Sequence, residues 1–152
     1  MKKSILLLLL LTFSTAIFSQ ETDSKYDEKL AKSLNADDRG MKKHVFCLLK
    51  TGSNTTATKE ETQKLFEGHM SNISRLAKEG KLVVAGPFMK NERNYRGIYI
   101  FNASSIEEAK EFVATDPAVQ SNLLEAELTL WYGTAALQET LKIHEKIAKT
   151  KM

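Results

Sequence analysis

The sequence has a single cysteine among its 152 residues, and it contains no long run of charges of one sign. One cysteine cannot form an intramolecular disulfide, so the fold must be stabilised by a hydrophobic core or by association between chains. Cys47 lies in an apolar, strand-like segment, where we expect it to be a small buried hydrophobic residue. A disulfide-stapled framework is therefore excluded.

Charge and histidine spacing exclude further classes of function. The formal net charge is only +3, and the basic residues are scattered among acidic ones without an aromatic-rich basic patch, so no nucleic-acid partner is expected. The sequence also lacks a glycine-rich phosphate loop and a nucleophile elbow. The three histidines, His44, His69 and His144, show no metal-ligand spacing, so no metal site is expected.

The N-terminus has the pattern of a secretory signal peptide. Two lysines precede an apolar run, and the run gives way to small residues such as Ser14, Ala16 and Ser19. The apolar part is shorter than the roughly 20 residues needed to span a bilayer, and no lipoprotein cysteine stands at the cleavage point. We expect residues 1–19 to be removed and the mature chain to be periplasmic or secreted, with no membrane anchor.

The mature chain is long enough for one domain with an extension at each end. Residues 20–43 are polar, but Tyr26, Leu30 and Leu34 recur at helical spacing, which predicts a short helix that docks on the domain. Residues 44–134 form the predicted domain. An amphipathic segment from Ala135 to Lys149 predicts a C-terminal helix within residues 135–152.

Within the domain, strands and helices alternate. Thr58 and Glu61 form a capping box that starts a helix, and Gly80 is placed to end it. Ser104 and Ser105, followed by two glutamates, offer a second capping box. The predicted strands are 44–50, 81–88, 95–103 and 126–133, and the predicted helices are 58–79, one beginning after 105, and a short one within 115–124.

The resulting order, β-α-β-β-α-β, predicts an α+β, ferredoxin-like protomer with a four-stranded antiparallel sheet and two helices on one face. An uncovered sheet face normally shows a polar residue at every second position. Three of the predicted strands are instead apolar at consecutive positions, over residues 45–49, 82–85 and 98–101. Both faces therefore require burial, and we expect a homodimer in which two sheets pack face to face.

His69 and Asp116 are the candidate site residues, and each has two interpretations. His69 shares a helix face with Phe66 and Ile73, so it is either a core histidine bonded to a backbone carbonyl or a functional group in a cleft. Asp116 precedes Pro117, a typical helix start with aspartate as N-cap. The aromatic residues Tyr95, Tyr99 and Trp131 are interpreted as strand packing.

Several of these features, in this order, resemble the YCII-related family. They are His69, Gly80, the "AGP" of residues 85–87, the helix "SSIEEAKEF" at 104–112 and the "TDPAV" of 115–119. The resemblance covers about residues 44–132, most of the mature chain. The segment "NADDRGMKKHVFCLLKTG", residues 35–52, also resembles the lead-in of secreted members from Bacteroidetes-type bacteria.

The resemblance implies a dimeric α/β-barrel built from ferredoxin-like protomers, and a His–Asp pair that falls on His69 and Asp116. Relatives of the broader fold include a dehydrochlorinase and muconolactone isomerases, which move protons on small cyclic or aromatic substrates. No cofactor is implied. The sequence departs from the commoner pattern at Leu65–Gly68, where an arginine shortly before the histidine is absent.

Two functions follow as expectations. In the first, the protein is a lyase or isomerase in which His69 is the general base, Asp116 orients it, and Gly86, Pro87 and Phe88 shape the rim of a small-molecule pocket. In the second, it is a non-catalytic dimeric module that binds a small molecule or a partner protein. The sequence identifies no substrate or ligand.

Overall fold

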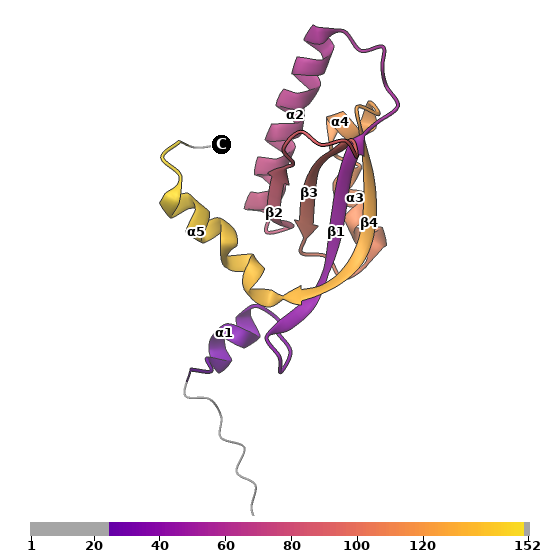
Figure 1. Cartoon of the computed structure of the whole chain (residues 1–152). Helices are drawn as coiled ribbons and strands as arrows, with labels where there is room; N and C mark the ends of the chain where they lie inside the picture. Colours follow the sequence, from indigo (N-terminus) through magenta and orange to yellow (C-terminus); the bar gives the residue numbers. More distant parts are fainter. Residues whose placement is uncertain (1–24, 151–152) are drawn as a thin grey trace, which may run out of the picture.

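The computed structural model describes residues 25–150, so the expected signal peptide lies outside the described residues. One antiparallel sheet has the strand order β2-β3-β1-β4 (Figure 1). Its strands are β1 (Met41–Thr51), β2 (Leu82–Pro87), β3 (Tyr95–Phe101) and β4 (Leu124–Thr134). Helix α2 (Lys59–Lys78) joins β1 to β2, while α3 (Ile106–Val113) and α4 (Pro117–Gln120) lie between β3 and β4. The predicted ferredoxin-like protomer is confirmed.

Strand β1 lies in the middle of the sheet and sets its register. Cys47 pairs with Tyr99 of β3 on one side and with Leu128 of β4 on the other. Strands β1 and β4 are longer than the sequence predicts, because their ladder continues down to the pair Met41–Thr134. Neither segment carries enough apolar residues at those ends to show the extension in the sequence.

Both long helices begin at side-chain caps. Thr58 and Glu61 form the predicted capping box at the start of α2. At α3, Ser105 is the N-cap and accepts from the backbone N–H of Glu108. The reciprocal bond differs from the prediction, because the Glu108 carboxylate accepts from the backbone N–H of Ser104 and not from that of the N-cap.

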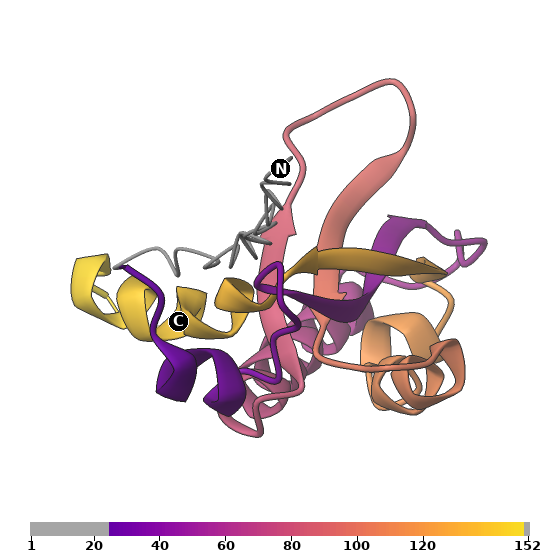
Figure 2. The same ribbon diagram turned by 90° about the horizontal axis from the view of Figure 1, so that it is seen from below.

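The hydrophobic core fills the space between the sheet and the helices, which lie on one side of it (Figure 2). From β1 the core receives Val45, Cys47 and Leu49, whose alternation matches the period of a strand with one face buried. Cys47 is fully buried, as predicted. Burial, reinforced by the nearby charge of Asp116, raises the pKa of the Cys47 thiol to about 12.

The C-terminal segment is not the single helix that the sequence predicts. It consists of a 3-10 helix, η1 (Ala135–Glu139), followed by α5 (Thr140–Ile147). The tighter turn carries the chain from β4 across to the far edge strand, where the hydroxyl of Thr140 donates to the carbonyl of Val83 at 2.8 Å. A helix with α-helical geometry from residue 135 onward would have continued in a different direction.

The N-terminal helix α1 (Glu28–Ser33) exists, but it does not dock as expected. Tyr26 and Leu30 are 60% and 47% exposed, whereas Leu34 is half-buried. The segment is attached by polar contacts instead: Gln138 donates to the carbonyl of Leu34 at 2.7 Å, and the Tyr132 hydroxyl donates to Asp37.

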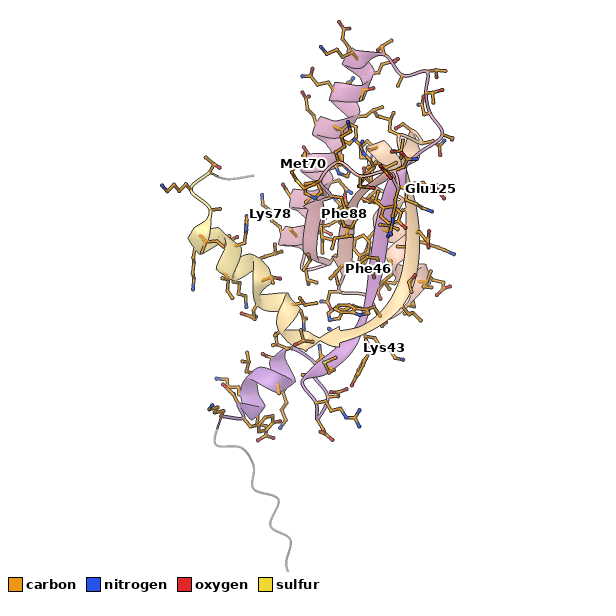
Figure 3. The ribbon with its side chains drawn as sticks, in the orientation of Figure 1. Lys43, Phe46, Met70, Lys78, Phe88 and Glu125 are labelled. Atoms are coloured by element: carbon orange, nitrogen blue, oxygen red, sulfur yellow. The ribbon has the colours of Figure 1, made fainter. Side chains whose placement is uncertain are left out.

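The face of the sheet away from the helices, hereafter the open face, is also apolar over strands β1 to β3, whereas β4 contributes Glu127 and Thr129 to it. Its half-buried side chains include Phe46, Leu48, Val84 and Ile98, and Figure 3 labels Phe46 on β1. The loop of the β2–β3 hairpin extends away from the sheet on this same side (Figure 2). The prediction of two apolar sheet faces is thus confirmed for the protomer.

Candidate active site

Helix α2 and the short helix α4 approach each other closely at Gly68. A Cβ atom at Gly68 would lie 2.9 Å from Cγ of Pro117, a distance that real side chains do not tolerate. The absence of a side chain at this position lets the next residue of α2, His69, reach the residue that precedes Pro117. That residue is Asp116.

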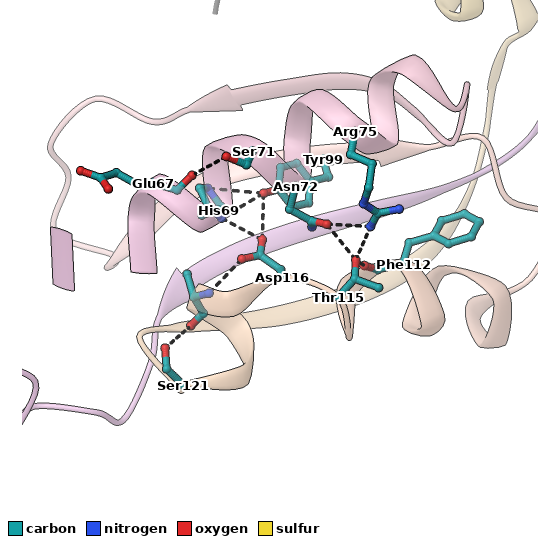
Figure 4. Close-up of polar contacts among 11 residues, drawn as sticks. Glu67, His69, Ser71, Asn72, Arg75, Tyr99, Phe112, Thr115, Asp116 and Ser121 are labelled. Atoms are coloured by element: carbon teal, nitrogen blue, oxygen red, sulfur yellow. Dashed lines mark hydrogen bonds and ion pairs between the residues drawn. The ribbon is translucent and has the colours of Figure 1, made fainter. Parts of the chain in front are cut away.

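His69 and Asp116 form a buried hydrogen-bonded pair (Figure 4). The distance from Nδ1 of His69 to Oδ2 of Asp116 is 2.8 Å, and the two residues are 8% and 0% exposed. The second oxygen of Asp116, Oδ1, accepts from the backbone N–H of Ala118 at 3.0 Å. Asp116 therefore caps α4 and contacts the imidazole at the same time.

Tyr99 completes the pair from the sheet side. Its hydroxyl donates to Oδ2 of Asp116 at 3.2 Å and lies 3.3 and 3.4 Å from the two ring nitrogens of His69. These nearly equal distances place the hydroxyl beside the carbon between the nitrogens, so it bonds neither nitrogen in line. Burial and the charge of Asp116 raise the pKa of Tyr99 far above its usual value, so the hydroxyl stays protonated as a donor.

Tyr99 packs in the core as the sequence predicts, but the sequence did not identify the bond from its hydroxyl to Asp116. The signal that could have identified it is its position in β3, where it faces the core between Ile98 and Ile100 and pairs with Cys47. A tyrosine at a fully core-facing position must find a partner for its hydroxyl. This requirement of a buried hydroxyl, and not a sequence motif, would have pointed to a polar group across the core.

The contacts of the pair determine its chemical state. A carboxylate only accepts hydrogen bonds, so Nδ1 of His69 carries a proton, and in the neutral ring the lone pair is then on Nε2. Phe66 meets the imidazole edge-on, with ring centroids 5.6 Å apart, and the Tyr99 ring stacks on it at 6.0 Å. The arrangement is an imidazole with aromatic neighbours, oriented by a buried carboxylate, and in its neutral form it can accept a proton at Nε2.

The β1-to-β4 region that holds this pair also matches a family model, that of the YCII-related domain, over residues 43–131. The chain belongs to the YCII-related family. The match spans β1 to β4 and includes both His69 and Asp116. The extensions α1 and α5 lie outside the matched YCII-related domain.

Two comparisons place this YCII-related protein among known ones. It is 34% identical over 77 residues to the uncharacterized protein YjpA of Bacillus subtilis (strain 168), an alignment that covers 51% of this chain and 87% of the relative. A similar solved structure is 5-chloro-2-hydroxyhydroquinone dehydrochlorinase (TftG) from Burkholderia phenoliruptrix AC1100 in complex with 2,5-dihydroxybenzoquinone. The TM-score is 0.44 at 18% identity, covering 57% of this chain and 92% of that one.

The expected rim residues of the YCII-related domain lie at the start of the β2–β3 hairpin. Gly86 is half-buried, while Pro87 and Phe88 are exposed. Phe88 lines a cavity of about 590 Å3 together with residues 89–93 and Tyr95, and this lining includes neither Gly86 nor Pro87. His69 is not part of it either, so the structure does not join this cavity to the buried pair.

Close to the pair, the edge strand β2 has an exposed position on the helix side of the sheet. Ala85 on β2 is paired with Tyr99, so the two side chains point to the same face of the sheet, toward the helices. Tyr99 is buried but Ala85 is exposed, although both face the helices. Helix α2 therefore leaves the edge strand uncovered at Ala85, directly beside the residue that contacts His69.

The other two histidines of the YCII-related protein are elsewhere. His44 is fully buried, its Nε2 lies 3.2 Å from the carbonyl of Thr134, and desolvation lowers its pKa, which keeps it neutral. His144 is exposed on α5. Within residues 25–150, no three His, Cys, Asp or Glu side chains gather as a metal ion would require.

One further finding concerns membranes. Over the part of the chain that the structure describes, no helix is both long enough and apolar enough to cross a bilayer.

Proposed function

We propose that this protein is a YCII-related enzyme that transfers a proton on a small organic substrate, as a lyase or isomerase, with Nε2 of His69 as the base. The observation that carries the proposal is the buried bond between Nδ1 of His69 and Asp116, which leaves Nε2 as the lone-pair nitrogen. Membership of the YCII-related family supports it, because the resemblance to this family implies a His–Asp pair at these two positions.

The proposed step is the removal of a proton from a carbon next to a carbonyl group. The C–H bond breaks, a bond forms between the proton and Nε2 of His69, and the electron pair moves onto the carbonyl oxygen as an enolate. The proton then returns to a different carbon in an isomerase, or the electron pair expels a leaving group in a lyase. The carboxylate of Asp116 stabilises the imidazolium that forms between the two steps.

The proposal predicts base-catalysed hydrogen exchange. In D2O, the protein should accelerate deuterium incorporation into at least one member of a panel of small cyclic ketones, unsaturated lactones and dihydroxyaromatic compounds, followed by proton NMR. Because general base catalysis typically contributes 10²–10⁴-fold, His69→Gln should lower the exchange rate by at least about 100-fold. His144→Gln, on exposed α5, is the matched control and should leave the rate unchanged. Equal rates in wild type and folded His69→Gln would contradict the proposal.

The alternative is a non-catalytic dimeric module that binds a small molecule or a protein. The observation that favours it is the hairpin cavity of about 590 Å3, which is separate from the His–Asp pair and includes the 89%-exposed Met89 and the 45%-exposed Phe88 in its lining. A ligand that protects this hairpin from exchange while the His69→Gln variant binds it equally well would favour the module over the enzyme.

Export to the periplasm or the medium is part of the proposal, on the strength of the lysine, apolar and small-residue order of residues 1–19 and the resemblance of residues 35–52 to secreted members. The intact mass of the protein recovered from its producing cell should correspond to a chain that starts near Gln20. A cytoplasmic product that retains Met1 would contradict export.

A further inference from the structure

Helix α2 contacts the turn before α4 a second time, one helical turn beyond His69. Oδ1 of Asn72 accepts from Nη2 of Arg75 at 2.7 Å and lies 2.9 Å from the Thr115 hydroxyl, whose one proton is shared with the carbonyl of Phe112 at 2.6 Å. The same guanidinium nitrogen donates to the Thr115 hydroxyl at 2.8 Å. Three side chains thus close a triangle between α2 and the turn, as Figure 4 shows.

The triangle lowers the stability of the protein at one buried atom, which indicates that it has a role beyond stability. Asn72 is only 7% exposed, and its side-chain NH2 group has no hydrogen-bond partner among the described residues. A buried donor without a partner lowers stability, whereas an apolar side chain at this position would avoid that cost. Unlike an apolar residue, Asn72 provides a hydrogen-bond acceptor, Oδ1. Among the described contacts, this atom bonds only to Arg75 and Thr115.

We infer that Asn72, Arg75 and Thr115 form a clamp that positions Asp116 against His69. Thr115 directly precedes Asp116 in the chain, and Asn72 follows His69 by three residues, so both contacts lie on the same face of α2. The bonds of Asp116 to His69 and Tyr99, and the contact of Gly68 with Pro117, hold the turn at Asp116 and at the residue after it. The clamp holds the turn at the residue before Asp116, so the turn is attached on both sides of the carboxylate that accepts the Nδ1–H bond.

Arg75 holds the clamp from the surface. Its other nitrogen, Nη1, donates to Glu79 at 2.8 Å, so the guanidinium is fixed at both ends of its planar fork. Arg75 is therefore a positioning residue and does not replace the arginine that is absent before His69. The consequence of the clamp for catalysis rests on the proposed function. The effect of the clamp on the Nδ1 proton of His69 can be measured without any substrate.

The test measures how fast the Nδ1 proton of His69 exchanges with water, by NMR of the protein labelled with 15N-histidine. Thr115→Val keeps the shape of the side chain and removes its hydroxyl, and it should accelerate this exchange by about fivefold, the factor that a typical lost hydrogen bond represents. Thr115→Ser keeps the hydroxyl and should restore the wild-type rate to within about twofold.

Two further variants distinguish loss of the clamp from a nonspecific destabilisation of the fold. Ser121→Ala removes a hydroxyl that bonds to the carbonyl of Ala118 in α4 but takes no part in the clamp, and it should leave the exchange unchanged. Arg75→Met alters a side chain that is 43% exposed, so the fold should survive and the exchange should accelerate as in Thr115→Val. An unchanged rate in Thr115→Val, or an equal acceleration in Ser121→Ala, would overturn the inference. A clamp confirmed in a protein that catalyses no exchange would refute the proposed function alone.

Discussion

Replacing Asp116 with asparagine should reverse the tautomer of His69 without unfolding the protein. Asparagine is a good N-cap, so its oxygen can still accept from the backbone N–H of Ala118. Its NH2 group would then face Nδ1 of His69, at the place where Oδ2 now lies 2.8 Å away. A donor facing Nδ1 requires a lone pair there, so the proton moves to Nε2. Long-range 1H–15N NMR correlation of the labelled imidazole distinguishes the two tautomers directly.

Loss of the correct tautomer should cost most of the activity. With the proton on Nε2, His69 can no longer accept one there, and the exchange rate in D2O should fall by at least about 100-fold, as for His69→Gln. The urea midpoint should change little, since the cap is retained. Retention of the Nδ1–H tautomer in Asp116→Asn would contradict the assigned hydrogen-bond direction.

The alanine variant at the same position should instead have a markedly lower free energy of unfolding. Asp116→Ala removes a cap and leaves the buried donors of His69 and Tyr99 without an acceptor. A lost cap costs about 1 kcal/mol, and each unsatisfied buried donor costs about 1–3 kcal/mol, so the unfolding free energy should fall by about 4 kcal/mol. Urea titration of Asp116→Ala beside Asp116→Asn measures the difference, and similar midpoints would contradict it.

The second large effect concerns assembly. The wild-type protein should be a homodimer in which the open faces of two sheets pack together, because leaving several hundred Å2 of apolar surface in water forgoes on the order of 10 kcal/mol. Phe46→Glu places a charge at the middle of the open face, opposite Ile100 of β3 and Thr129 of β4. An unpaired buried charge costs at least about 3 kcal/mol, so the dissociation constant should rise by 100-fold or more.

Light scattering coupled to gel filtration at micromolar concentration measures this change. Wild type should elute with twice the mass of the Phe46→Glu variant. The matched control is Lys110→Glu, which introduces the same charge on the exposed helix side and should remain dimeric. A monomeric wild-type protein would show instead that the chain covers its own open face.

Much of the fold was predictable because its signals are local. The capping box at Thr58 fixes the start of α2, and Gly80, at a φ of +69°, adopts the left-handed conformation expected of a residue that ends a helix. Asp116 before Pro117 begins α4 as predicted. Each of these features depends on residues within a few positions of one another, so the sequence alone contains the information.

The features that could not be predicted depend on distant residues. Tyr99 and Asp116 are brought together by the packing of β3 against α4, and no spacing in the sequence marks that contact. The sequence also does not mark the break between η1 and α5. The break depends on the position of β2 and not on the residues of the segment itself. The periodicity of Tyr26 and Leu30 gave the helix correctly, but periodicity identifies an apolar face without identifying what covers it.

The burial of Cys47 has a consequence for the oxidising chemistry outside the cytoplasm. An unpaired cysteine in an exported protein is open to capture by the enzymes that form disulfides, and that reaction proceeds through the thiolate. With its pKa raised to about 12, only about one Cys47 thiol in 100,000 would be ionised at pH 7, and it is fully shielded from solvent. If export occurs as proposed, the folded chain would keep its one thiol reduced in an oxidising compartment, and no wrong pairing would compete with the predicted association of two copies.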